Sequence, residues 1–238
     1  MTTTPATGDL GAVLVHGMWH GAWAWDAVRA ELDAAGIANT VVELPMTDLA
    51  SDVAATRRVL DEFDRPAVLV GHSYGGAVIT EAGVHPSVEQ LVYLTAFQLD
   101  EGESVARVLP ELELPPAPLV EALRFSEDGR WSTVDPALAG AVLYGDAAPD
   151  LAAAAVARLR PAGRALLAGV PAAIAWRQVP STYVVLGDDQ AINPDLQRAM
   201  AARATWRHDW PGDHSPAAAR STEVAELITS LARTNPAG

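Results

Sequence analysis

The chain alternates between short apolar runs and longer stretches in which apolar residues recur at helical spacing. Short runs without polar positions are typical of strands that are buried on both faces of a sheet. The predicted strands are Ala12–Val15, Thr40–Leu44, Ala67–Val70, Leu91–Leu94, Thr182–Leu186 and, more weakly, Ala204–His208.

Helices are predicted between these strands, with boundaries marked by capping residues, Gly or Pro. They are Trp25–Ala35, a helix from a cap at Asp48 or Ser51 to about Phe63, Gly75–Val84, Pro194–Arg203 and Pro216–Ala232. This alternation of strands with helices is typical of βαβ units. The predicted fold class is therefore α/β, with a mostly parallel sheet flanked by helices.

The stretch between Phe97 and Trp176 interrupts this order. It contains no convincing strand, and prolines divide it into short pieces rich in Ala and Leu. Because the βαβ pattern resumes at Tyr183–Leu186, we interpret residues 98–176 as a helical cap inserted into a core formed by residues 1–97 and 177–238. The alternative is a second helical domain with its own core.

Composition narrows the possible chemistry. A length of 238 residues suits one domain with an insertion. The chain has no Cys, which excludes disulfides, thiolate metal sites and Cys nucleophiles. All sixteen basic residues are Arg. The absence of Lys excludes Schiff-base chemistry and the Lys of a phosphate-binding loop.

Charge and hydropathy indicate the compartment and the partners. A formal net charge of −14 argues against binding to nucleic acid or to an anionic membrane. Residues Met1–Asp9 lack the features of a signal peptide, and no apolar run reaches the ~20 residues that span a bilayer. We expect a cytoplasmic protein that acts on a small molecule. Whether it forms a homodimer is left open.

The segment Gly71–Gly76 carries the most specific motif. It matches G-x-S-x-G, with an apolar strand before it and a helical pattern after it. A sharp strand-to-helix turn holds such a serine in a strained conformation, so small residues must flank it. Gly71 and Gly75 meet that requirement, and Ser73 is predicted to be a nucleophile.

An earlier loop is expected to bind the oxyanion. His16-Gly17-Met18-Trp19 follows the first predicted strand, where backbone N–H groups can stabilise negative charge. The amides of Met18 and Tyr74 are the predicted donors. Gly17, which supplies backbone freedom, and Trp19 are expected to contact the substrate. His16 is expected to be structural.

Ser73 requires a general base, and six histidines are candidates. His214 lies in a loop between the last predicted strand and the last helix, which completes the chain order Ser, acid, His. His72 is expected to face away from the serine. His85 falls in a surface connection and His208 in a strand. His214 is therefore the predicted base.

A carboxylate should orient the imidazole of this base. Asp188 and Asp189 both follow the strand Thr182–Leu186, and local physics does not separate two neighbours in one loop. Asp100, after the fourth strand, is a further candidate.

These residues together carry a family resemblance. The run Val13–Leu44 with its segment His16–Trp25, the segment Val179–Pro194 and the loop around His214 resemble one branch of the α/β-hydrolases. That branch contains plant methyl esterases, hydroxynitrile lyases and bacterial esterase relatives. The resemblance covers nearly the whole chain, the cap only loosely. It implies that Asp189 is the acid and that the cap covers the pocket and sets the substrate.

The resemblance also implies two alternatives to ester hydrolysis. Lyases of this branch use the same three residues, but they have Thr at the position of Gly17 and a Lys that handles cyanide. Non-catalytic hormone receptors with this fold can also retain the three residues. Because this chain has Gly17 and no Lys, we expect a serine hydrolase that cleaves a carboxylic ester of an apolar or aryl molecule through an acyl-enzyme. No cofactor and no metal are expected.

Overall fold

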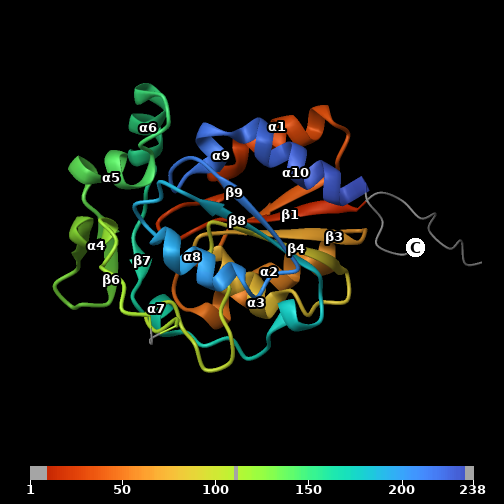
Figure 1. The fold of residues 1–238 in the computed structure, drawn as a ribbon, viewed down its shortest axis with the longest axis horizontal. Coiled ribbons are helices and arrows are strands. Elements are labelled where there is room, and N and C mark those ends of the chain that lie inside the picture. Colours follow the sequence, from red (N-terminus) through yellow and green to blue (C-terminus); the bar gives the residue numbers. More distant parts are fainter. Residues whose placement is uncertain (1–9, 110–111, 234–238) are drawn as a thin grey trace, which may run out of the picture.

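A six-stranded, entirely parallel sheet forms the centre of the computed structural model, which describes residues 10–109 and 112–233 (Figure 1). The strand order is β2-β1-β3-β4-β8-β9. The strands are β1 (Gly11–Val15), β2 (Asn39–Val42), β3 (Ala67–His72), β4 (Val88–Leu94), β8 (Ser181–Leu186) and β9 (Trp206–Trp210). Each pair is in parallel register, which confirms the predicted fold class.

Helices cover both faces of this sheet (Figure 1). One face carries the 3-10 helix η1 (Ala22–Trp25) and the α-helices α1 (Asp26–Ala34), α9 (Pro216–Ala219) and α10 (Ser221–Arg233). The other face carries α2 (Leu49–Glu62), α3 (Gly75–Ala82) and α8 (Pro194–Ala201). Because β1, β3 and β8 are buried along their whole length, they have no polar face and read as continuous apolar runs.

Local chemistry sets the helix boundaries. The Asp48 side chain accepts the Ser51 amide, so Asp48 rather than Ser51 caps α2. Asn193 caps α8 in the same way, with Pro194 in the first turn. The predicted helix Pro216–Ala232 is divided at Arg220 into α9 and α10.

The segment between β4 and β8 differs from the prediction. Its helices are α4 (Leu119–Ala122), α5 (Pro136–Leu143), α6 (Pro149–Val156), α7 (Ala165–Ala168) and the 3-10 helix η2 (Ala175–Arg177). It also contains a three-stranded antiparallel sheet of β5 (Leu123–Phe125), β6 (Trp131–Val134) and β7 (Ala162–Gly163).

The prediction that this segment lacks strands is therefore wrong. The strands are two to four residues long and too short to show a strand period. The turn between β5 and β6 contains Asp128-Gly129, with Gly129 at a φ of +66°. Asp-Gly between two short runs is a hairpin signal, and it is the sequence feature that identifies this sheet.

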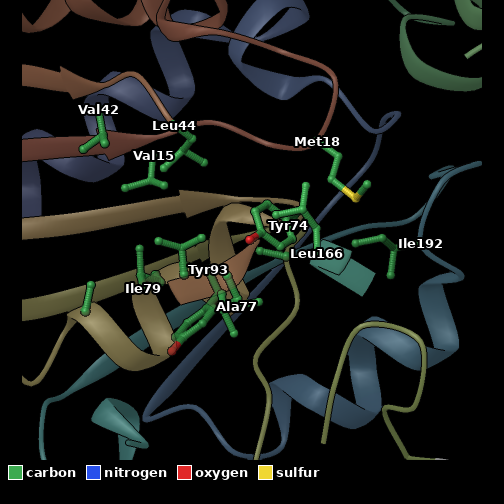
Figure 2. Packing of buried hydrophobic residues seen from close by; sticks show 14 of the residues in the cluster. Val15, Met18, Val42, Leu44, Tyr74, Ala77, Ile79, Tyr93, Leu166 and Ile192 are labelled. Atoms are coloured by element: carbon green, nitrogen blue, oxygen red, sulfur yellow. The ribbon is translucent and has the colours of Figure 1, made fainter. Parts of the chain in front are cut away.

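Buried residues of this segment belong to the same hydrophobic cluster as the sheet core. Ala122, Val142 and Leu166 join the cluster that contains Val15 and Leu69. Figure 2 shows Leu166 of α7 in this cluster with Met18, Tyr74 and Ile192. The segment thus packs directly on the core at one end of the sheet (Figure 1).

Within the described ranges, no helix has the length and apolar character that crossing a bilayer requires. Residues Met1–Asp9, which lack the features of a signal peptide, lie outside the described residues.

Candidate active site

Ser73 lies in a sharp turn between β3 and α3. Its φ is +54°, a conformation that L-residues rarely adopt and that tight packing must enforce. A Cβ at Gly71 would lie 2.6 Å from the carbonyl oxygen of Gly75, and a Cβ at Gly75 would lie 2.7 Å from that of Val15. The flanking glycines are therefore required by close backbone approach, as the motif predicts.

The structure brings Ser73, His214 and Asp189 into one hydrogen-bonded chain. Ser73 Oγ lies 2.9 Å from His214 Nε2, and His214 Nδ1 lies 2.8 Å from Asp189 Oδ2. All three side chains are largely buried. In this arrangement Nδ1–H donates to the carboxylate and Nε2 accepts the serine proton, which is the geometry of general-base activation.

Asp189 is held in place by several donors. Its Oδ1 accepts the amides of Ala191 and Ile192 at 2.6 and 2.9 Å. Its Oδ2 accepts the Gln197 side chain at 2.8 Å and the hydroxyl of Thr95. These four donors fix the orientation of the Asp189 carboxylate.

The two other candidate acids lie elsewhere. Asp188 is exposed and accepts the Gly212 amide at 3.0 Å, so it closes the loop before His214. Asp100 pairs with Arg177 at the surface. The structure thus distinguishes Asp189, which contacts His214, from its neighbour Asp188, a choice that the local sequence did not decide.

The predicted oxyanion residues lie against the nucleophile. Tyr74 follows Ser73 directly, and a Cβ at Gly17 would lie 2.9 Å from Ser73 Cβ, which places the Met18 loop beside the serine. Within the described ranges, neither the Met18 amide nor the Tyr74 amide donates to another group of the protein. Both donors are therefore open to a developing oxyanion.

Trp19 connects this loop to the inserted segment. It has a φ of +63°, and its Nε1 donates to Ser132 Oγ at 3.1 Å. The Ser132 hydroxyl in turn donates to the carbonyl of Ala162 at 3.2 Å. Trp19, which was predicted to contact the substrate, therefore joins the Met18 loop to β6 and β7.

Arg160 holds the same loop from the inserted segment. Its amide donates to the carbonyl of Trp19 at 2.8 Å, and its Nε donates to the carbonyl of His20 at 2.7 Å. Its Nη2 donates to the carbonyl of Leu44 at 2.8 Å and pairs with Glu43. The Arg160 side chain thus joins the loop after β1 to the loop after β2.

The loop begins and ends with buried histidines, His16 and His20, that are neutral near pH 7. Burial lowers the pKa of His16 to about 3 and that of His20 to about 4. His16 Nδ1 donates to the Gly17 carbonyl within the loop at 2.9 Å, and its Nε2 accepts the Leu44 amide at 3.1 Å. His20 Nδ1 donates to the Met18 carbonyl at 2.7 Å, and its Nε2 accepts the Tyr144 hydroxyl at 2.6 Å.

The remaining histidines lie away from Ser73 Oγ. His72 Nε2 donates to the backbone carbonyl of His214 at 2.7 Å, and burial holds the His72 pKa well below its ordinary value. It therefore fixes the backbone of the predicted base. His85 contacts Ser87 and Asp61 in a surface connection, and His208 lies in the exposed strand β9.

Tyr74, the second predicted oxyanion residue, is anchored inside the core. The Tyr74 hydroxyl donates to Asp52 Oδ2 at 2.9 Å, and Asp52 Oδ1 accepts the Met46 amide at 2.8 Å. Burial raises the pKa of Asp52 to about 6. This fully buried carboxyl positions the ring of Tyr74, whose amide is the other predicted donor.

Sequence reasoning missed several of these supporting residues. Thr95 directly follows β4, and the carboxyl ends of parallel strands are where α/β sites form, so its position was a usable signal. Gln197 and Arg160 carry no local signal, because their partners are distant in the chain. In the described ranges, no group of three or more His, Asp or Glu residues is arranged to hold a metal ion.

Known proteins with similar sequences include plant enzymes. The chain is 28% identical over 256 residues to "Methylesterase 7" of Arabidopsis thaliana, covering 92% of this chain and 95% of that protein. It is 32% identical over 119 residues to "Alpha-hydroxynitrile lyase" of the same species, covering 43% of this chain and 46% of that protein. These relatives fall in the branch that the sequence resembles.

A solved structure of a pyrethroid hydrolase from Sphingobium faniae JZ-2 has the same fold. It superposes with a TM-score of 0.79 at 22% identity and covers 96% of this chain and 98% of that chain. The model of a family described as "Alpha/beta hydrolase family" matches residues 12–227, which include the sheet, Ser73, Asp189 and His214. The chain therefore belongs to the alpha/beta hydrolase family.

Proposed function

We propose that this protein hydrolyses a carboxylic ester through an acyl-enzyme on Ser73. The observation that carries the proposal is the continuous chain from Ser73 Oγ through His214 to Asp189, at 2.9 and 2.8 Å. It lies beside two open backbone amides, so a nucleophile, a base and an oxyanion site occur together. The similarity to an enzyme named as a methylesterase supports the same chemistry.

Each group has a role in the two half-reactions. Ser73 Oγ attacks the ester carbonyl carbon while His214 Nε2 takes the hydroxyl proton. The amides of Met18 and Tyr74 stabilise the oxyanion of the tetrahedral intermediate. The C–O bond to the alcohol then breaks, and His214 returns the proton to the leaving oxygen. A water molecule, deprotonated by His214, attacks the acyl-enzyme and releases the acid and Ser73.

The substrate class is a small apolar or aryl ester. Residues 98–176 act as a cap in this proposal, because they pack on the oxyanion loop through Ser132, Tyr144 and Arg160. Several apolar cap residues, among them Phe125 and Trp131, face solvent instead. The inner residues of this segment, rather than its apolar content as a whole, therefore set the preference.

Ester hydrolysis fits the site better than cyanohydrin cleavage. A side chain at Gly17 would place its Cβ 2.9 Å from Ser73 Cβ, so a Thr at this position requires a backbone shift. The chain also lacks a Lys that could receive cyanide, and Arg does not exchange its proton near neutrality. We expect no cyanide release from mandelonitrile above that of the Ser73→Ala variant.

A panel of aryl and methyl esters tests the proposal. Ser73→Ala should lower kcat by roughly three orders of magnitude or more, because the nucleophile is lost and only binding and oxyanion stabilisation remain. A fluorophosphonate should modify Ser73 alone, as read by peptide mass spectrometry. Absence of turnover on every ester together with unreactive Ser73 would favour a non-catalytic binding protein. Enantioselective cyanide release would favour a lyase.

A further inference from the structure

A pocket of about 230 Å³ lies between α6 and the helices η1, α1 and α9. Its walls are mostly apolar and include Trp23, Trp25, Leu151 and Ala217. Among the described residues that line it, Ser73, Asp189 and His214 do not occur. The pocket is therefore distinct from the space in which the proposed ester hydrolysis takes place.

Residues that support the active site form the inner end of this pocket. His20 and His72 both line it, with ring centroids 6.0 Å apart. His20 holds the Met18 carbonyl and His72 holds the His214 carbonyl, each at 2.7 Å. A ligand in the pocket therefore contacts two rings that are bonded to the backbone of Met18 and of His214.

The inner wall carries no charge near neutrality. Burial lowers the pKa of His20 to about 4 and that of His72 well below its ordinary value, so both rings are neutral. The charged lining residues Arg158 and Asp26 are partly exposed and face each other at 3.7 Å. Beside His20 and His72 an ionised ligand group would lose its hydration without a counter-charge, because Arg158 pairs with Asp26 and lies over the Trp23 ring instead. The pocket therefore favours an uncharged ligand.

The volume of the pocket and its aromatic walls restrict the kind of ligand further. An apolar cavity of about 150 Å³ in another protein holds benzene, so this pocket has room for one ring with a short substituent. Trp25 and Tyr144 offer aromatic surfaces against which an aromatic ring packs well, whereas the Arg158 guanidinium lies over the Trp23 ring at 4.6 Å. The hydroxyls of Tyr144 and Ser215 at the inner end can pair with one polar group.

We propose that this pocket is a second binding site, for an uncharged single-ring aromatic molecule that carries one hydroxyl group. This site does not depend on the proposed esterase activity, because none of the three proposed catalytic side chains lines it.

Fluorine NMR with 4-fluorobenzyl alcohol and the full chain tests the proposal. We expect saturable binding, and 4-fluorobenzoate should bind at least about tenfold more weakly because its carboxylate must be desolvated. Ala154→Phe, on the exposed side of α6 at the pocket wall, should weaken binding of the alcohol by at least about tenfold by filling the space. Ala153→Phe, the exposed neighbour that does not line the pocket, should change it by less than about twofold.

NMR of the unsubstituted protein locates the bound ligand. The indole N–H signals of Trp23 and Trp25 should shift on titration, whereas that of Trp206, in the exposed strand β9, should not. Three results would overturn the proposal: no saturable binding, equal effects of the two Ala→Phe variants, or shifts that spare Trp23 and Trp25. Equal or tighter binding of 4-fluorobenzoate would overturn the assignment to an uncharged ligand.

Discussion

The serine–histidine side of the site and the loop that carries Met18 are held largely by different parts of the chain. Ser73, His214 and Asp189 are fixed by core residues, among them Thr95 after β4 and Gln197 on α8. The Met18 loop is fixed by Arg160, Ser132 and Tyr144, all from the inserted segment. The difference indicates that the core positions the proposed nucleophile and base, whereas the segment between β4 and β8 positions one of the proposed oxyanion donors.

The two proposed oxyanion donors differ in the same way. The Tyr74 amide belongs to the turn before α3, and its ring is tied to Asp52 in the core. The Met18 amide belongs to a loop whose next residue, Trp19, has a positive φ and is bonded to the insertion. Changes at Arg160 or Ser132 should therefore affect the Met18 amide more than the Ser73–His214 pair. Asp146 of the same segment exchanges hydrogen bonds with Asp213 at 2.9 and 3.0 Å, so changes there should reach the loop of His214 instead.

The largest effect is expected where the core holds the base. Asp189→Asn should lower kcat on an aryl ester by about 10³–10⁴, because the imidazole loses its orienting charge and can adopt the wrong tautomer. Asp188→Asn is the matched control and should cost less than about tenfold, since Asp188 only accepts the Gly212 amide. Equal losses in the two variants would contradict the assignment of Asp189.

The buried carboxyl behind Tyr74 should make stability depend on pH. Its pKa is about 6 in the folded protein against 3.8 for an ordinary Asp, so the folded state binds the proton more tightly. Its contribution is therefore complete below about pH 4 and is lost as the pH rises through 6.

Comparison of wild type with Asp52→Asn measures this contribution. The unfolding free energy of the wild type relative to the variant should fall by up to about 3 kcal/mol between pH 4 and 7. Urea unfolding at several pH values provides the measurement. A difference that stays constant over this range would show that Asp52 titrates as it does in the unfolded chain.

The Arg160 contacts should act on kcat more than on KM. Arg160→Ala should lower kcat by about 10- to 100-fold through displacement of the Met18 amide, with KM changed by less than about threefold. Arg160→Lys should recover little, because Lys cannot make the separate Nε and Nη bonds.

Arg177→Ala is the control for Arg160. Arg177 pairs with Asp100 and Glu101 at the surface, and the substitution should leave kcat within about twofold. A boronic acid that mimics the tetrahedral intermediate should lose affinity for Arg160→Ala in proportion to the loss of kcat. An unchanged affinity would place the role of Arg160 outside the oxyanion site.

The smallest effect is expected at the Trp19–Ser132 bond. Ser132→Ala should lower the unfolding free energy by about 1 kcal/mol and kcat by less than about threefold, since Arg160 still holds the loop. Denaturant unfolding and steady-state kinetics on one preparation measure both. A loss of kcat as large as that of Arg160→Ala would show that Trp19, rather than the Arg160 contacts, positions the loop.

Much of the fold could be predicted because its signals are local. Strands such as Ala67–His72 are continuous apolar runs, and helix starts such as that after Asp48 carry capping residues. The strands of the inserted segment were missed because they are too short to show a period. Their one local signal was the Asp-Gly turn at Asp128-Gly129.

The sequence by itself determined the parallel sheet, the turn at Ser73 and the candidate base His214. Each follows from spacing within a few residues or from order along the chain. Only the tertiary structure placed Asp189 rather than Asp188 on the imidazole, because the choice depends on which side chain of one loop points inward.

The structure alone also connected Arg160 to the loop at Met18–His20, about 140 residues earlier in the chain. Such partners meet only after the sheet has brought its strand ends together and the insertion has packed onto them. A guanidinium that binds backbone carbonyls requires no particular residue types at their positions, so the sequence carries no trace of the contact.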